Sequence, residues 1–149
     1  MSEPQTPYLV DTNIVVLDVR QGEPANGLAS WATLRVPDVH YLSIISVGEL
    51  LAFSRRLRWG PARLDALDQV ISGYQCLDVS DPAVLEAYAE IDDFTTTAGR
   101  PMGKNDVWIA ATARASGLVL LTADADFDHL HPAWLTRLRI DPATGLRLP

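Results

Sequence analysis

Short apolar segments alternate with helical segments along this 149-residue chain, and that alternation constrains the fold more than any other feature. Runs typical of buried strands, rich in β-branched and aromatic residues, occupy residues 8–10, 39–44, 75–79 and 118–121. Helical patterns lie between and beside them, at residues 14–17, 24–34, 46–59, 62–71, 82–97 and 105–115. Strands that alternate with helices form parallel sheets covered on both faces. The sequence therefore predicts an α/β fold of three α/β/α layers with a central, mostly parallel sheet.

One domain is expected to account for residues 1–149, because this length is typical of one domain and no internal repeat is visible. We expect a core over about residues 8–140 and short flexible tails at both ends. The only cysteine, Cys76, has no partner for a disulfide, and no Cys/His cluster has the spacing of a zinc site. The N-terminus lacks the pattern of a signal peptide or a membrane segment. These features predict a cytoplasmic protein without membrane association.

The net charge of -7 argues against a surface that holds nucleic acid by charge alone, because such binding relies on many contacts from Lys and Arg to phosphates. It does not exclude chemistry on nucleic acids. If the acidic residues are concentrated around a metal ion, the bound cation changes the sign of the local charge.

Carboxylates follow two of the predicted strands. Asp11 comes directly after residues 8–10, and Asp124 comes shortly after residues 118–121. Ligands of open parallel α/β sheets bind beyond the carboxyl ends of the strands. If the two strands are neighbours, both carboxylates point to one place. Each could also be an ordinary helix N-cap.

Two further carboxylates lie early in predicted helices. Glu49 is three residues after Ser46, a candidate N-cap, so the pair also fits a capping box. Asp106 lies in the first turn of an alanine-rich helix, where an acidic residue is favourable for the helix dipole. Taken singly, each residue has this simpler explanation.

A shared site would bring these four carboxylates close together. Four such groups within about 4 Å repel by roughly 4 kcal/mol per close pair at an effective dielectric near 20, so the cluster needs protons or cations. Ligands that are all oxygen select hard cations, and Mg²⁺ or Mn²⁺ suits a few carboxylates with several waters.

Four segments match a known family in order and separation: residues 10–13 (Val-Asp-Thr-Asn), 46–50 (Ser-Val-Gly-Glu-Leu), 104–113 and 121–127. With these segments the chain resembles the PIN domain, and in particular the VapC-like toxins of bacterial and archaeal toxin-antitoxin modules. The resemblance runs from Tyr8 to about Pro132. It implies a PIN-like fold and an endoribonuclease that hydrolyses RNA by a metal-activated water, with Mg²⁺ or Mn²⁺ as cofactor.

The resemblance also implies roles for single residues. Asp11, Glu49 and Asp106 match the first three acidic positions of the family, and the fourth is either Asp124 or Asp126, with Asp124 preferred. The catalytic set is thus Asp11, Glu49, Asp106 and Asp124, and the metal ligands are expected among Asp11, Asp106, Asp124 and Asp126.

Asn13 and Thr122 resemble the polar residues that hold the family's carboxylates or their waters, although both types are also common in turns and caps. The family further implies a toxin that forms a homodimer and binds a cognate VapB-like antitoxin near the active site.

Basic residues are candidates for RNA binding. Arginines lie before and after Trp59, which could stack on a base: Arg55, Arg56, Arg58 and Arg63. They equally fit a solvated helix end, where positive charge is favourable. Lys104, the only lysine, lies two residues before Asp106, where it could reach a phosphate.

Two alternatives lack nuclease activity: a PIN fold that serves only as an interaction module, and a receiver-like module that holds a divalent ion for regulation. A receiver needs a phosphoacceptor at the end of a middle strand, and the corresponding segment offers only Asp78. The first alternative conflicts with the presence of all four acidic positions.

Overall fold

The computed structural model describes residues 7–21 and 40–149. Its strands form one sheet in the order β3-β2-β1-β4-β5-β6. The strands are β1 (Tyr8–Val10), β2 (Tyr41–Ser43), β3 (Gln75–Leu77), β4 (Val119–Thr122), β5 (Arg137–Ile140) and β6 (Arg147–Leu148). All pairings are parallel except that of β5 with β6, which confirms the mostly parallel sheet.

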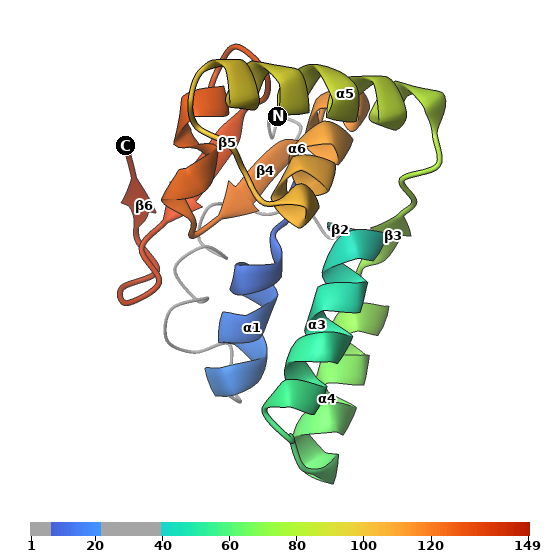
Figure 1. The fold of residues 1–149 in the computed structure, drawn as a ribbon. Helices are drawn as coiled ribbons and strands as arrows, with labels where there is room; N and C mark the ends of the chain where they lie inside the picture. Colours follow the sequence, from blue (N-terminus) through green and yellow to red (C-terminus); the bar gives the residue numbers. More distant parts are fainter. Residues whose placement is uncertain (1–6, 22–39) are drawn as a thin grey trace, which may run out of the picture.

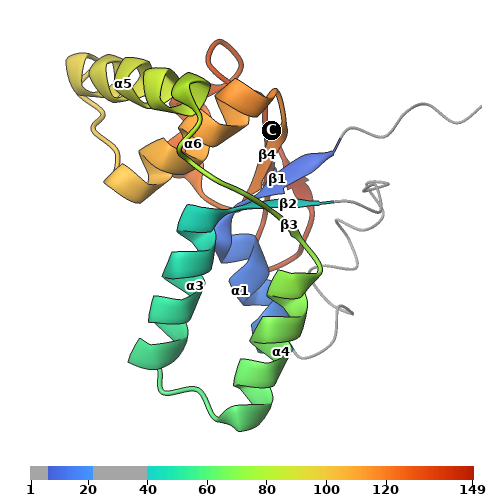
Figure 2. The same cartoon turned by 90° about the vertical axis from the view of Figure 1, so that its right-hand side faces the viewer.

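Helices cover both faces of this sheet (Figures 1 and 2). They are α1 (Thr12–Gln21), α3 (Ile44–Arg56), α4 (Pro61–Ser72), α5 (Pro82–Thr97) and α6 (Lys104–Ser116), together with the 3₁₀ helix η1 (Ala125–Leu130). The helix expected at residues 24–34 lies outside the described residues. Within the part of the chain that is described, no helix combines the length and apolar character needed to cross a bilayer.

The two faces of the sheet bury separate apolar clusters. Leu9 and Leu120 pack with α5 and α6, whereas their neighbours Val10 and Leu121 pack with α1, α3 and α4. Successive side chains of a strand point to opposite faces, so a strand buried on both sides is a continuous apolar run. This arrangement is the predicted three-layer fold.

The strands that carry the acidic residues are neighbours. β1 pairs with β4 in a register that places Val10 beside Leu121, and the amide of Asp11 donates to the carbonyl of Leu121 at 2.8 Å. The condition on which the predicted site depended is therefore met. Asp11 and Thr122 leave the sheet side by side at its carboxyl edge.

The start of α3 differs from the prediction. The helix is capped by Ser43, whose hydroxyl accepts from the amide of Ile45 at 3.1 Å, and not by Ser46. Either serine fits the local cap pattern, but β2 ends at Ser43 and the helix begins at once. Ser46 is buried inside the first turns, so the capping-box explanation of Glu49 is wrong.

The C-terminal segment contributes two strands that the sequence pattern did not predict. In β5, buried Leu138 and Ile140 alternate with Arg137 and Arg139, which both pair with Asp128 of η1. The residues after Asp141, expected to be a linker-like tail, return as β6 along the edge of the sheet. A strand of two residues is too short to give a periodic signal.

Candidate metal centre

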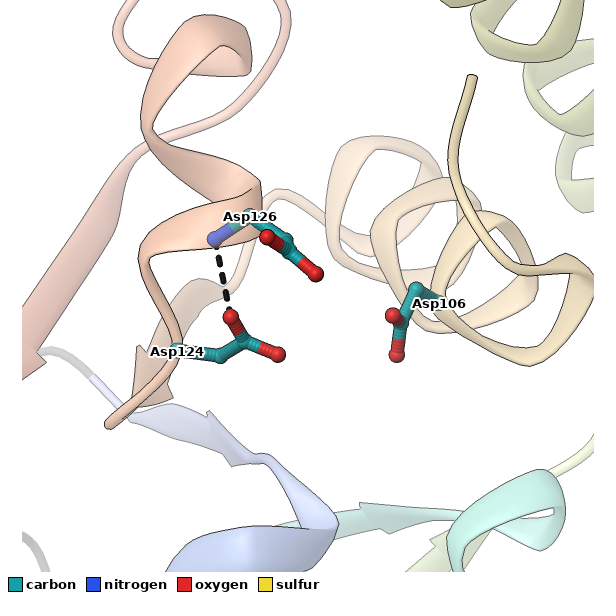
Figure 3. A group of neighbouring side chains, drawn as sticks. All are labelled: Asp106, Asp124 and Asp126. Carbon is teal, nitrogen blue, oxygen red and sulfur yellow. Dashed lines mark hydrogen bonds between the residues drawn. The ribbon is translucent and has the colours of Figure 1, made fainter. Parts of the chain in front are cut away.

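Three aspartates converge beyond the ends of β1 and β4 (Figure 3). Each of them, Asp106, Asp124 and Asp126, offers a carboxylate oxygen within 4.8 Å of the other two. Asp106 comes from the first turn of α6, and the other two come from the junction of β4 and η1. Segments almost twenty residues apart in the sequence thus supply one acidic cluster.

Asp124 is also the N-cap of η1. Its Oδ1 accepts from the amide of Asp126 at 2.9 Å, and its own amide donates to Thr122 Oγ1 at 2.9 Å. Its second oxygen points toward Asp106 in Figure 3. The capping explanation and the site explanation are therefore compatible, because each uses a different oxygen of the carboxylate. The geometry brings Asp124 and Asp126 equally into the cluster.

Asp11 lies at the bottom of the site, only 3% exposed. Oδ1 accepts from the amide of Thr12 at 2.8 Å, and Oδ2 accepts from Thr122 Oγ1 at 2.7 Å. Burial raises the pKa of Asp11 from 3.8 to about 7, because it disfavours the charged form. The two hydrogen bonds oppose this rise in pKa, and the negative charges of Asp106 and Glu49 add to it.

Asp106 is affected in the same way. Its pKa rises to about 6, first because of burial and then because of the neighbouring charges of Asp124, Glu49 and Asp126. Burial is the main reason that both carboxyls have raised pKa values, and the negative charges of their neighbours add to it. A cation placed between them would favour their charged forms.

Glu49 reaches the site from α3 and is held there by α1. The hydroxyl of Thr12 lies 2.8 Å from Glu49 Oε1 and 2.9 Å from Ser46 Oγ. Because an ionised carboxylate only accepts, Thr12 donates to Glu49, and Ser46 donates to Thr12. This chain of hydroxyls fixes α3 against the start of α1.

The predicted supporting residues join the same network. Thr122 donates to Asp11 and accepts from the amide of Asp124, so one hydroxyl orients two of the carboxylate segments. Asn13 Oδ1 accepts from the amide of Ala123 at 3.2 Å and ties the start of α1 to the end of β4.

A cavity of about 480 Å³ opens over these residues. Its acidic side is lined by Asp11, Glu49, Asp106 and Asp124. Among the basic residues considered for RNA binding, Arg56 lines this cavity, whereas Arg55, Arg58, Arg63 and Lys104 are exposed and lie outside its lining.

Trp59 does not stand at the surface as a base-stacking residue would, so this hypothesis is wrong. It is 8% exposed and packs edge-on against Phe53 in the core between α1, α3 and α4. α3 ends shortly before Trp59 and α4 begins at Pro61, so Trp59 lies in the short connection and packs with Leu50 of α3 and Leu67 of α4.

The oxygen donors fit a hard divalent cation. Two ligands on opposite sides of an octahedral Mg²⁺ lie about 4.2 Å apart, since each bond is about 2.1 Å long. The oxygens of Asp106, Asp124 and Asp126, within 4.8 Å of one another, need only a small side-chain adjustment to reach one ion. A cation bound there would offset the burial and the like-charge repulsion that raise the pKa values of Asp11 and Asp106.

Several residues of the site were not expected from the sequence. Thr12 and Ser46 lie inside matching segments, but only the packing of α1 against α3 shows that their hydroxyls position Glu49. Phe53 and Pro142 line the cavity from α3 and from the turn between β5 and β6. Helical spacing from Glu49 is a signal that could have found Phe53, whereas nothing in the sequence marks Pro142.

The receiver-like alternative loses its support in the structure. Asp78 follows β3, which is the edge strand of the sheet and not a middle one. Its Oδ1 accepts from the amides of Val79 and Ser80 at 2.6 and 3.1 Å, as in a turn. A phosphoacceptor would need a place beside the acidic cluster.

Comparison with known proteins identifies the family. The PIN domain family model matches residues 8–131. VapC ribonuclease Y4jK of Sinorhizobium fredii is 30% identical over 127 residues, which cover 78% of this chain and 86% of that protein. Toxin FitB of Neisseria gonorrhoeae is 28% identical, with the same coverage of 78% and 86%.

Solved structures agree with the fold. VapBC2 from Rickettsia felis, crystallised with a DNA fragment from its promoter, matches with a TM-score of 0.77 at 21% identity, over 91% of this chain and 99% of that chain. FitAcB from Neisseria gonorrhoeae matches with a TM-score of 0.68 at 25% identity, over 87% and 95%. The predicted fold class is confirmed.

Proposed function

Because the chain belongs to the PIN domain family, we propose that it is an endoribonuclease that hydrolyses RNA phosphodiester bonds with the help of Mg²⁺ or Mn²⁺. One observation carries the proposal: oxygens of Asp106, Asp124 and Asp126 lie within 4.8 Å of one another, and the buried Asp11 lines the same cavity as Asp106 and Asp124. The name of one relative, VapC ribonuclease Y4jK, points to the same chemistry, and the name of another, Toxin FitB, points to a toxin.

Different residues of the site have different proposed roles. Asp106, Asp124 and Asp126 would hold the cation, with Asp11 completing the negative charge around it. A bound Mg²⁺ or Mn²⁺ supplies Lewis-acid polarisation of the phosphodiester and lowers the pKa of water. Thr122 orients Asp11 and the Asp124 backbone, and Thr12 orients Glu49. Glu49 then faces the cavity as an acceptor that can orient a water molecule.

Cleavage of RNA tests this function. The purified protein should cleave a single-stranded RNA with Mn²⁺ and stop in EDTA. Asp106→Asn should lower the rate at least a hundredfold, since it removes one charged ligand from the cluster. Asp65→Asn, the same change on the exposed face of α4, should keep the full rate. Cleavage that persists in EDTA, or in Asp106→Asn, would contradict the proposal.

The biological role follows from the same relatives. We propose that the chain is the toxin of a toxin-antitoxin pair, held inactive by a VapB-like antitoxin and active on RNA in the cytoplasm. Solved neighbours include VapBC complexes, and the related FitAcB structure is 25% identical. Coexpression with the product of an adjacent small gene should yield a complex in which RNA cleavage is suppressed. Free cleavage by that complex would contradict the assignment.

A homodimer and a single-domain organisation also belong to the proposal. Ile44 and Leu51 on α3 are 43% and 44% exposed, and their spacing of seven residues puts them on one face of the helix. An apolar face of this kind suits a second copy of the chain. Light scattering should give a dimer, and Leu51→Glu should give a monomer that still unfolds in one transition.

A further inference from the structure

The cavity above the acidic cluster has a second side of different chemistry. Away from the carboxylates, its lining is apolar, with one positive charge: Val16 and Leu17 of α1, Phe53 and Arg56 of α3, and Pro142. Metal binding and hydrolysis do not require an apolar wall. A polynucleotide presents phosphates and flat apolar bases in alternation, so both kinds of surface are useful beside a cleavage site.

Helical geometry explains why these side chains of α3 share the cavity with Glu49. At about 100° per residue, Phe53 lies about 40° and Arg56 about 20° from Glu49 around the helix. Arg55 lies about 120° away on the same count. Glu49, Phe53 and Arg56 therefore form one stripe, and all three line the cavity, whereas Arg55 does not.

Arg56 keeps its charge available to a ligand. Its guanidinium carbon lies 5.8 Å from the centre of the Phe53 ring, a cation–π contact that aligns the two side chains. Arg56 is exposed, and among the described residues no carboxylate lies within 4.0 Å of its guanidinium. An exposed arginine with no acidic partner among the described residues, in a cavity whose other charged groups are carboxylates, suits an anionic ligand.

We propose that Phe53 and Arg56 form a nucleotide subsite beside the scissile bond, in which Arg56 binds a phosphate of single-stranded RNA and Phe53 supports the adjacent base. The inference rests on the proposed ribonuclease function and adds the feature of the substrate that is recognised. Aromatic rings and guanidinium planes are the surfaces on which unpaired RNA bases stack. A basic peptide would be attracted by the four carboxylates but would leave Arg56 without an anionic partner, whereas a phosphate of RNA provides one, so the observations favour RNA.

Kinetics of three arginine variants test the phosphate contact. Arg56→Ala should raise KM for a single-stranded RNA about tenfold, with little change in kcat, because a charge-assisted contact is lost on binding. The slope of log(kcat/KM) against log[salt] should become shallower by about 0.7, the value for one phosphate on a single strand. Arg56→Lys should restore the slope, since it restores the charge.

Arg55→Ala is the matched control. It removes the same charge from the same helix, but its side chain lies outside the cavity, so KM should change less than about twofold and the salt slope should stay at the wild-type value. Equal effects of Arg55→Ala and Arg56→Ala would overturn the subsite, because both would then act through the general charge of the helix end.

Abasic substrates test the base contact. Phe53 also packs against Trp59, with ring centres 5.9 Å apart, so Phe53→Leu is preferred to Phe53→Ala. For the wild type, an abasic residue at one position next to the cleaved bond should lower kcat/KM about tenfold. On intact RNA, Phe53→Leu should also lower kcat/KM about tenfold. On the abasic RNA, Phe53→Leu should have the same kcat/KM as the wild type on that substrate. Additive losses would overturn the contact.

The possible outcomes distinguish failure of the subsite from failure of the proposed ribonuclease function. A wild-type protein that cleaves RNA, with Arg56→Ala indistinguishable from Arg55→Ala, overturns the subsite and leaves the ribonuclease intact. If Arg56→Ala and Phe53→Leu cleave RNA normally but no longer bind the antitoxin, the apolar side of the cavity binds a protein partner. This result also overturns the subsite. A wild type that cleaves no RNA with Mn²⁺ removes the ribonuclease function and the subsite together.

Discussion

Replacing Asp11 by asparagine should make the metal-free protein more stable at neutral pH. Asp11 is buried, and its pKa is raised from 3.8 to about 7. In the unfolded chain this carboxyl ionises freely, so between these pH values the folded protein binds more protons than the unfolded one. The free energy of unfolding of the wild type must therefore fall as the pH rises through this window.

The size of the effect follows from the same pKa values. A rise from 3.8 to about 7 corresponds to about 4 kcal/mol at about 1.36 kcal/mol for each pKa unit. The penalty is absent below pH 3.8 and complete above about pH 7. Asparagine carries no charge, but it leaves the Thr122 hydroxyl without its acceptor, at a cost of about 1 kcal/mol.

Asp11→Asn should thus gain about 3 kcal/mol at pH 8, which raises Tm by about 6–12 °C for a protein of this size. At pH 4.5 the penalty in the wild type is mostly absent, and the two Tm values should differ by about 2 °C or less. Thermal unfolding is followed by circular dichroism in EDTA at pH 4.5, 6 and 8.

Asp65→Asn is the control, because it makes the same substitution at an exposed position of α4. Its Tm should follow the wild type at every pH. A variant at Asp11 that is no more stable than the wild type at pH 8 would refute the reasoning. So would a wild type whose stability in EDTA does not fall between pH 4.5 and pH 8.

Three further experiments address other parts of the molecule. Mn²⁺ at one hundred times its dissociation constant should raise the free energy of unfolding by about 2.7 kcal/mol, measured as Tm, and Asp106→Asn should remove most of that rise. Thr122→Val should lower the free energy of unfolding by about 2 kcal/mol and slow RNA cleavage, because Asp11 and the amide of Asp124 lose a buried hydrogen-bond partner. Thr122→Ser keeps the hydroxyl and should retain both the stability and the cleavage rate. Gly117 ends α6 with a left-handed backbone at φ 72°, so Gly117→Ala should lower the free energy of unfolding by about 1 kcal/mol without changing RNA cleavage. An unchanged Tm would contradict this left-handed cap.

The sheet and the convergence of the carboxylates were predictable because they rest on topology. Asp11 and Asp124 follow short apolar runs that favour buried strands, and neighbouring parallel strands end at the same edge. For these two residues, the pairing of β1 with β4 was the condition that a single sequence does not reveal, and Glu49 depended in addition on its helix facing the strand ends. Once it holds, no fine detail of packing is needed to bring these residues together.

Features that depend on packing between helices and strands were harder to predict from the sequence. The serines at 43 and 46 fit the cap of α3 equally well on local pattern, and only the end of β2 decides between them. The role of Ser46 follows from the neighbouring helix, through the hydroxyl of Thr12. The same holds for Trp59, whose burial depends on the return of α4 along α3.

For the arginines after Glu49, the geometry of the helix could have predicted more than the composition did. Arg55, Arg56 and Arg58 cannot be ranked by composition, since all three give the same positive charge to one helix end. Once Glu49 is assigned to the site, the period of the helix ranks them, because Arg56 falls about 20° from Glu49 and Arg55 about 120°. The cavity lining agrees with this order. A single assigned residue on a helix therefore predicts which of its neighbours face the substrate, and the contrast between Arg56→Ala and Arg55→Ala measures that prediction directly.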